Sequence, residues 1–199
     1  AAIGAGLPIS EATGSMIVDV GGGTTEIAVM SLGGVVFSKS LRIAGDAMDG
    51  AIINYMRKKF NLLIGESTAE KIKKEIGTAI PTTSNVFLMK GRDIRTGTPK
   101  EISLTEEDAC EALMPILNQM LAAIKEALES TPPELSADLV DMGLVLTGGG
   151  ALLKNIDKLI SKDTGLPVTI ADNPLECVAI GTGKALENEE LFSTMLSEY

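Results

Sequence analysis

The chain of 199 residues contains no histidine and two cysteines, Cys110 and Cys177. Without histidine it can form no Ser-His-Asp or Cys-His nucleophile system and no histidine metal site. The cysteines are far apart and form no Cys-x-x-Cys pattern, which argues against a zinc site and a disulfide framework. With no base to activate them, both are interpreted as small core residues on predicted helices. A reducing compartment, the cytoplasm, is therefore expected.

Long apolar segments are also missing. No uninterrupted apolar stretch approaches the roughly 18 residues of a transmembrane helix, so no membrane span is expected. The first residues contain neither an initiator methionine nor a basic signal region, and the chain is expected to be a piece of a longer protein. The net charge of −10 argues against a general nucleic-acid binder.

Charge is distributed unevenly along the chain. Residues 1–38 carry three acids and no base, residues 39–100 carry twelve bases and six acids, and residues 101–199 carry five bases and eighteen acids. A basic middle between acidic flanks suits a bound anion or an acidic partner surface. The alternative is two solvated faces of opposite sign, and Arg57, Lys58 and Lys59 are interpreted as such a solvated helix face.

Apolar periodicity predicts strands that alternate with helices, which favours an α/β fold. Strands are expected at residues 16–20, 26–30, 35–43, 86–90, 101–104, 144–147 and 168–170. Helices are expected from Asp46, from a capping box at residues 67–70, from Thr105 with Asp108, from residue 151 to 161, and after Pro174. Pro115 predicts a kink in the third helix. Residues 47–104 are interpreted as an insertion with its own basic sheet.

The first of two glycine triplets follows Asp19 at the end of a predicted buried strand. Gly21, Gly22 and Gly23 permit positive φ and close approach, so successive N–H groups can form an anion nest for phosphates. Asp19 could hold a hydrated Mg²⁺ through its waters, and Thr24 places a hydroxyl at the same edge. The alternative is a plain hairpin turn, although a hairpin needs fewer than three glycines. Neither triplet is a Walker A loop, and no GxGxxG pattern occurs.

The second triplet, Gly148, Gly149 and Gly150, joins a predicted buried strand to a predicted helix. Free N–H groups at a helix N-terminus suit a phosphate or sugar oxygen, and bare glycine backbone would let a flat base lie against it. The alternative is a tight connection without function. Glu70 and Lys73, on the capped helix of the basic middle, stay ambiguous because capping and an ion pair with neighbouring Lys74 also explain Glu70.

These motifs together resemble the actin, Hsp70 and sugar-kinase ATPase superfamily. The residues that carry the closer resemblance, to the MreB family of bacterial actins, are 1–8, 11–16, 19–26, 51–55, 70–77 and 146–153. The resemblance covers essentially the whole chain. It implies an actin-like (ribonuclease H-like) α/β fold with an inserted α+β lid, as one half of a two-domain protein.

The resemblance also implies a division of the chain. Residues 1–46 and 105–179 would form the lower, IIA-like nucleotide-binding subdomain, and residues 47–104 the upper, IIB-like lid. Residues 180–199 would return towards an absent first domain. The family's first phosphate loop and its catalytic glutamate are missing, so this segment alone is expected to lack ATP hydrolysis. The family's Gly-Gly-Asp is Ala44-Gly45-Asp46 here, and no contact is assigned to Ala44.

The family pattern implies ATP or ADP with Mg²⁺. Asp19 would serve the Mg²⁺, the first triplet would form a phosphate loop, and Thr24 would orient the attacking water. The residues expected around the adenosine are Glu70, Lys73, Gly148, Gly149, Gly150, and Ala151 and Leu152 through their amides.

Intact family members polymerise at the inner face of the membrane and guide cell-wall synthesis and rod shape. Self-association and contacts with cell-wall elongation and membrane-associated proteins are therefore implied. Two alternatives remain: an isolated, non-catalytic interaction or polymer-contact module, or another ATPase of the same superfamily.

Overall fold

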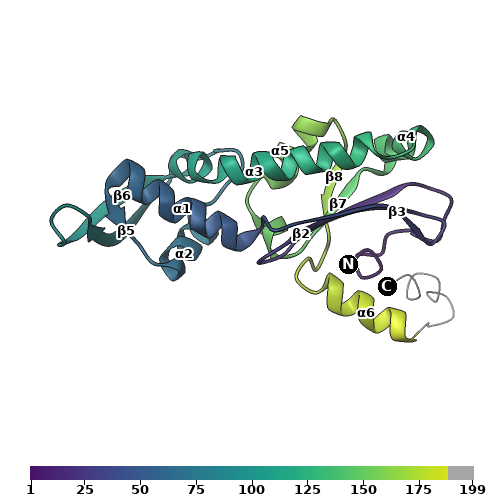
Figure 1. Cartoon of the computed structure of the whole chain (residues 1–199), viewed down its shortest axis with the longest axis horizontal. Helices are drawn as coiled ribbons and strands as arrows, with labels where there is room; N and C mark the ends of the chain where they lie inside the picture. Colours follow the sequence, from purple (N-terminus) through teal and green to yellow (C-terminus); the bar gives the residue numbers. More distant parts are fainter. Residues whose placement is uncertain (188–199) are drawn as a thin grey trace.

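A five-stranded mixed sheet forms one part of the molecule in a computed structural model that describes residues 1–187 (Figure 1). Strands β1, β2 and β3 pair antiparallel, while β7 and β8 continue the sheet in parallel on the other side of β1. In spatial order the strands are β3 (Gly34–Leu41), β2 (Thr25–Ser31), β1 (Ser15–Val20), β7 (Leu144–Thr147) and β8 (Val168–Ile170). The expected α/β class is confirmed.

A smaller antiparallel sheet lies at the far end of the elongated molecule (Figure 1). Its strands are β4 (Leu62–Leu63), β5 (Val86–Asp93) and β6 (Pro99–Thr105), paired in that order. Helices α1 (Gly45–Phe60) and α2 (Glu66–Ile76) precede its long hairpin. The sequence did not predict β4, because two residues are too short to show a strand period.

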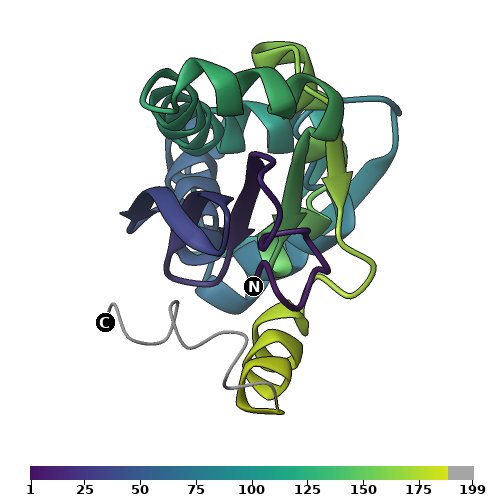
Figure 2. The same ribbon diagram turned by 90° about the vertical axis from the view of Figure 1, so that its right-hand side faces the viewer.

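Helices cover both faces of the five-stranded sheet. Figure 2 shows α3 (Glu106–Glu129) and α4 (Pro133–Met142) on one side, and the N-terminus with α6 (Cys177–Glu187) on the other. Helix α5 (Ile156–Thr164) precedes β8. Helix α4 was not predicted, because the Pro132-Pro133 pair was interpreted only as the end of α3. Pro133 also begins α4, and a proline is tolerated at this position because the first N–H groups of a helix have no partner within the helix. Helix α3 continues through Pro115.

Strand β1 is buried on both faces, which its near-continuous apolar sequence favours. Met16, Val18 and Val20 belong to the main core, together with the inward residues of α1 and α3. Ile17 instead packs in a second cluster with Ala2 and Ile9 of the N-terminal segment. This central strand ends at Asp19 and Val20, beside the first glycine turn. Packing on both faces therefore holds β1, and with it Asp19, in place.

Both cysteines are free and buried, with exposed fractions of 8% for Cys110 and 2% for Cys177. Burial raises the pKa of both thiols, which disfavours the reactive thiolate. Their interpretation as core residues is confirmed. Within residues 1–187, no helix has both the length and the apolar composition needed to cross a membrane.

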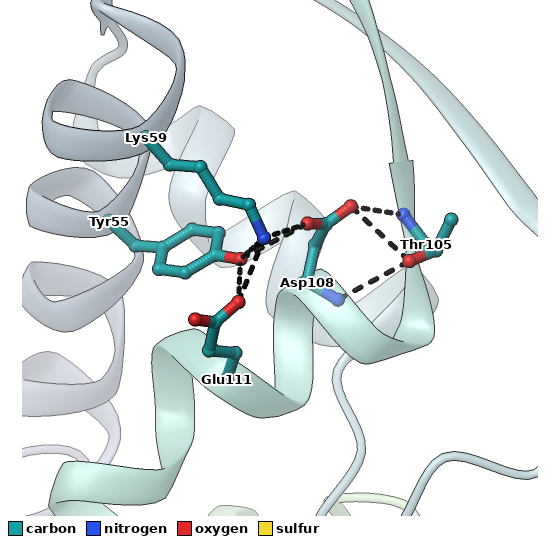
Figure 3. Close-up of polar contacts among 5 residues, drawn as sticks. All are labelled: Tyr55, Lys59, Thr105, Asp108 and Glu111. Atoms are coloured by element: carbon teal, nitrogen blue, oxygen red, sulfur yellow. Dashed lines mark hydrogen bonds and ion pairs between the residues drawn. The ribbon is translucent and has the colours of Figure 1, made fainter.

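A polar cluster joins α1 to the first turns of α3 (Figure 3). The Lys59 ammonium lies 2.9 Å from Asp108 Oδ1 and 2.8 Å from Glu111 Oε2, and the Tyr55 hydroxyl donates to both carboxylates. Asp108 also forms the expected capping box with Thr105, which is confirmed. The Glu111 carboxylate, helped by Tyr55 and Asp108, raises the pKa of Lys59. Lys59 is exposed as predicted, but it is paired rather than only solvated.

Candidate functional site

A cavity of about 820 Å³ lies where the two glycine turns meet α1 and α2. Its walls come from segments that are far apart in the sequence. Of the residues predicted for the site, those that line it are Gly21, Gly22, Glu70, Lys73, Gly149, Gly150 and Leu152. The predicted residues outside its lining are Asp19, Gly23, Thr24, Gly148 and Ala151. The fold thus brings both glycine triplets and the two α2 side chains to one hollow.

The first glycine turn is docked against the start of α1. Gly21 O accepts a hydrogen bond from the Gly45 N–H (3.2 Å), and Gly22 O accepts one from the Asp46 N–H (2.8 Å). Within residues 1–187, the N–H groups of Gly22 and Gly23 have no hydrogen-bond partner. Unpaired N–H groups on an exposed turn beside a cavity suit an anion, as the sequence predicted.

Asp19 and Gly148 are brought together by the parallel pairing of β1 with β7, in which Asp19 lies opposite Thr147. A Cβ added at Gly148 would lie 2.6 Å from Asp19 Oδ1 and 2.3 Å from Val20 O, and Gly148 has a φ of +80°. Only glycine fits this position without strain. The two glycine turns are therefore neighbours across adjacent strands, with the Asp19 carboxylate between them.

The surroundings of Asp19 bear on the predicted magnesium site. Within residues 1–187, no group of three or more Cys, Asp or Glu side chains is placed to hold a metal ion. A single carboxylate at a phosphate-binding edge does suit Mg²⁺ that keeps most of its waters and is shared with phosphates. The predicted water-mediated role of Asp19 stays a prediction.

The second glycine turn differs from the expectation. Residues 151–161 were predicted as one helix, which is wrong: a 3₁₀ turn covers Gly149–Leu152, and α5 begins only at Ile156. Left-handed backbone at Asn155 (φ +59°) separates the two. The α-helix N-terminus therefore does not face the cavity directly.

Within the 3₁₀ turn, Gly150 passes so close to β1 that an added Cβ would lie 2.2 Å from Val20 Cγ1. The Ala151 N–H donates to Gly148 O (3.2 Å), so this amide is engaged within the turn. The Leu152 side chain is 56% exposed and lines the cavity. The turn thus offers a small backbone surface and one apolar side chain, which suit a flat aromatic base.

Helix α2 supplies the opposite wall, but not through the predicted cap. The helix begins at Glu66 after Gly65, and no side chain caps it, so the expected capping box at residues 67–70 is wrong. Gly65 O accepts the N–H groups of Thr68 and Ala69 instead. Glu70 pairs with Lys74 at 2.6 Å, as its spacing predicted.

Lys73 points back to α1. Its Nζ lies 2.9 Å from Asp49 Oδ2 and 3.1 Å from Gly45 O, in a pair whose side chains are both largely buried. Burial raises the pKa of Asp49, while Lys73 opposes this shift, and nearby Glu70 and Asp46 add to it. Asp46 and Asp49 also line the cavity but were not among the predicted site residues. The two residues lie three positions apart in the first turns of the predicted helix, so they share its N-terminal end. This spacing could have identified them as neighbours of the site.

At one end of the cavity, hydrogen bonds join the segment after α2 to the loop before α5. Thr78 forms a parallel bridge with Lys154, and the Ala79 N–H donates to Lys154 O (2.8 Å). Asn155 Nδ2 donates to Thr78 Oγ1 (3.2 Å) and to Ile80 O (2.9 Å). The two walls that carry Lys73 and the second glycine turn are thereby held at a fixed separation.

The sequence as a whole matches one family model, described as MreB/Mbl protein, over residues 1–194. The chain belongs to the MreB/Mbl family. It is 55% identical over 188 residues to the cell shape-determining protein MreB of Escherichia coli K12, which covers 94% of the chain and 54% of that relative. It is 47% identical to the cell shape-determining protein Mbl of Bacillus subtilis 168, covering 94% of the chain and 57% of Mbl. The chain spans about half the length of these relatives.

Two solved structures share this fold. MreB5 of Spiroplasma citri bound to AMPPNP superposes with a TM-score of 0.91 at 38% identity, covering 95% of the chain and 57% of MreB5. The MamK double helical filament, at 22% identity and a TM-score of 0.76, supports the fold alone, over 94% of the chain and 57% of MamK. The predicted actin-like ATPase fold of the MreB family is confirmed.

Proposed function

We propose that this chain is the ATP-binding half of a filament-forming, actin-like protein that guides cell-wall synthesis and rod shape. The observation that carries the proposal is the convergence of both glycine turns and the α2 wall on one cavity. MreB5 of Spiroplasma citri, solved with AMPPNP and with ADP, supports the nucleotide as ligand. The names of the E. coli and B. subtilis relatives support the role in cell shape.

Each end of the nucleotide has a wall suited to its chemistry. The unpaired N–H groups of Gly22 and Gly23 would bind phosphate oxygens, and Asp19 would hold a Mg²⁺ ion through its waters, where the ion would offset phosphate charge. Lys73 and Glu70 bind the ribose and adenine with donors and acceptors on α2. The glycines of the 3₁₀ turn and Leu152 support the base. Thr24, exposed beside the turn, orients the attacking water.

The subdivision of the chain belongs to this proposal. Residues 1–46 and 105–179 form the lower, IIA-like subdomain, and residues 47–104 form the IIB-like lid with the small sheet. The last segment, 180–199, returns towards a first domain. Its residues up to 187 continue α6, and the others lie outside the described residues. The cavity is then one wall of a cleft between two domains.

The proposal extends to location and partners. The whole protein works in the cytoplasm and assembles with copies of itself at the inner face of the membrane, beside cell-wall elongation and membrane-associated proteins. Apolar side chains exposed on and before α6, among them Leu175 and Val178, supply surface for such contacts.

A titration with a fluorescent ATP analogue, combined with sedimentation, tests this function. We expect saturable binding that unlabelled ADP displaces and that Lys73→Ala weakens. Lys71→Ala is the matched control, since Lys71 is an exposed lysine of the same helix outside the cavity lining. Sedimentation of the chain without any nucleotide binding would contradict the proposal and favour a polymer-contact module instead.

A further inference from the structure

The Lys73 ammonium is fixed on the wall of the cavity by two acceptors of α1. Its Nζ donates to Asp49 Oδ2 (2.9 Å) and to Gly45 O (3.1 Å). The exposed fractions are 18% for the Lys73 side chain and 14% for that of Asp49. An ammonium has three donors, so these two bonds leave one for a molecule in the cavity.

Asp49 is poorly explained as a stabilising residue. Its Oδ1 is buried and, within residues 1–187, has no hydrogen-bond partner. Burial raises the pKa of Asp49 above its ordinary value of 3.8 despite the bond to Lys73. The folded state therefore disfavours the ionised carboxylate, and ionising it costs free energy of folding at neutral pH. The pair is better explained by what it does to Lys73.

We propose that Asp49 is a positioning residue, which holds the Lys73 ammonium so that its remaining N–H meets the ribose or base of a bound nucleotide. This inference rests on the proposed function. Glu70 cannot replace Asp49, because its carboxylate is half exposed and pairs with Lys74 at 2.6 Å. Asp49 lies on the cavity wall, but its Oδ2 is bonded to Lys73 and its Oδ1 is buried, so we infer that it acts through Lys73.

Positioning matters because lysine has a long, flexible side chain. A free lysine loses rotamer freedom when it binds a ligand, whereas one already held by two acceptors loses little. The resulting gain in affinity comes from the contact with the nucleoside part of the ligand, which ATP and ADP share. Affinity for both nucleotides should therefore depend equally on Asp49.

A double-mutant cycle separates this role from the alternatives. ADP with Mg²⁺ is titrated into the ¹⁵N-labelled 199-residue chain, and NMR shift changes give dissociation constants even for weak binding. The variants are Asp49→Asn, Lys73→Ala and the two combined, with Lys71→Ala as the control on the same helix. Asp49→Glu, which keeps the charge, is the conservative variant. Thermal unfolding of each variant checks the fold.

We expect Asp49→Asn to weaken ADP binding about tenfold, as the loss of one charge-assisted hydrogen bond would. The double variant should bind no more weakly than Lys73→Ala, since Asp49 has no role once Lys73 is gone. Asp49→Glu should retain more affinity than Asp49→Asn.

Three outcomes would overturn the positioning role while leaving nucleotide binding intact: unchanged affinity of Asp49→Asn, losses that add in the double variant, or weaker binding by Asp49→Glu than by Asp49→Asn. A parent chain that shows no shift with ADP would overturn the proposed function itself, and this inference with it.

Discussion

Asp19 differs from the carboxylates of α1 and α2 because it sits at the end of a strand and not on the cavity wall. It lies opposite Thr147 and next to Gly148, where the two glycine turns meet. A carboxylate at such an edge can act on phosphates only through an ion or water that bridges to them. Its effect should therefore depend on the metal concentration.

Asp19→Asn is expected to weaken Mg²⁺-dependent ADP binding while the fold stays intact, since Asn has the same shape and its neighbours β1 and β7 remain paired. The measurement is ADP affinity over a range of Mg²⁺ concentrations. The parent should gain affinity with Mg²⁺ and the variant should gain much less. An equal gain in both chains would show that Asp19 has no part in holding the ion.

Glu106 is a buried carboxylate whose role is structural. It is 3% exposed and accepts the N–H groups of Thr82 (2.9 Å) and Thr83 (3.0 Å). These backbone hydrogen bonds hold the pKa of Glu106 below its ordinary value of 4.5. Because the folded state lowers this pKa, the stabilisation is complete above pH 4.5 and disappears as the pH falls through the folded value.

Glu106→Gln should therefore lower the free energy of unfolding at pH 7, and the difference from the parent should shrink as the pH falls below 4.5. Urea unfolding at several pH values measures both. Glu107→Gln, an exposed neighbour on the same turn, is the control. A difference that stays constant down to the lowest pH would contradict the role of the ionised carboxylate.

At the scale of elements, the joint between α1 and α3 depends on Asp108. One of its oxygens accepts the Thr105 N–H (3.0 Å) at the helix start, and the other accepts from Lys59 and Tyr55 (Figure 3). The same carboxylate thus caps α3 and holds α1 against it.

Asp108→Ala should cost about 1 to 2 kcal/mol, since it removes half of a capping box together with the interhelical hydrogen bonds from Lys59 and Tyr55. Part of that loss should diminish in high salt, because Lys59 is partly exposed and its ion pairs are screened. Thermal unfolding of Asp108→Ala beside Glu107→Ala, at low and high salt, measures both effects. Equal melting temperatures for the two variants would contradict the role of Asp108.

Much of the element order could be predicted from the sequence, because apolar period and caps are local signals. The capping box at Thr105 is one such signal, and it is confirmed. The helix predicted at residues 151–161 was wrong because left-handed backbone at Asn155 and the bridge from Lys154 to Thr78 interrupt it. Such contacts form between distant segments and leave no periodic trace.

The candidate site could likewise be predicted only in part from the sequence. Glycine triplets after strands are visible in the sequence, and the fold brings both to one cavity. The pairing of Lys73 with Asp49 was not visible, because the two residues lie on different helices and meet only through the packing of α1 on α2. Side chains that share a cavity across elements need the tertiary structure.

At the scale of the whole molecule, the proposed function makes the cavity one wall of a nucleotide site. Hydrolysis of a phosphoanhydride needs charge stabilisation around the γ-phosphate and a held, activated water. Thr24 can orient a water but accepts its proton poorly, and the chain has no histidine to do so. An open site also weakens each electrostatic contact.

The purified 199-residue chain should therefore bind nucleotide weakly and release no phosphate from ATP. Steady-state phosphate release measures this, with Asp19→Asn prepared in the same way to reveal contaminating ATPases. Turnover by the parent above that background would show that these residues contain a complete active site.

The parallel pairing of β1 with β7 also determines the order in which the sheet can assemble on the ribosome. β1, β2 and β3 can form their antiparallel meander early, but the other edge of β1 stays open until residues 144–147 emerge. Closing so long a loop is slow, and an open apolar edge invites pairing with other chains. Between the synthesis of β1 and that of β7, this strand edge has no partner, and chaperone binding would matter most in that interval.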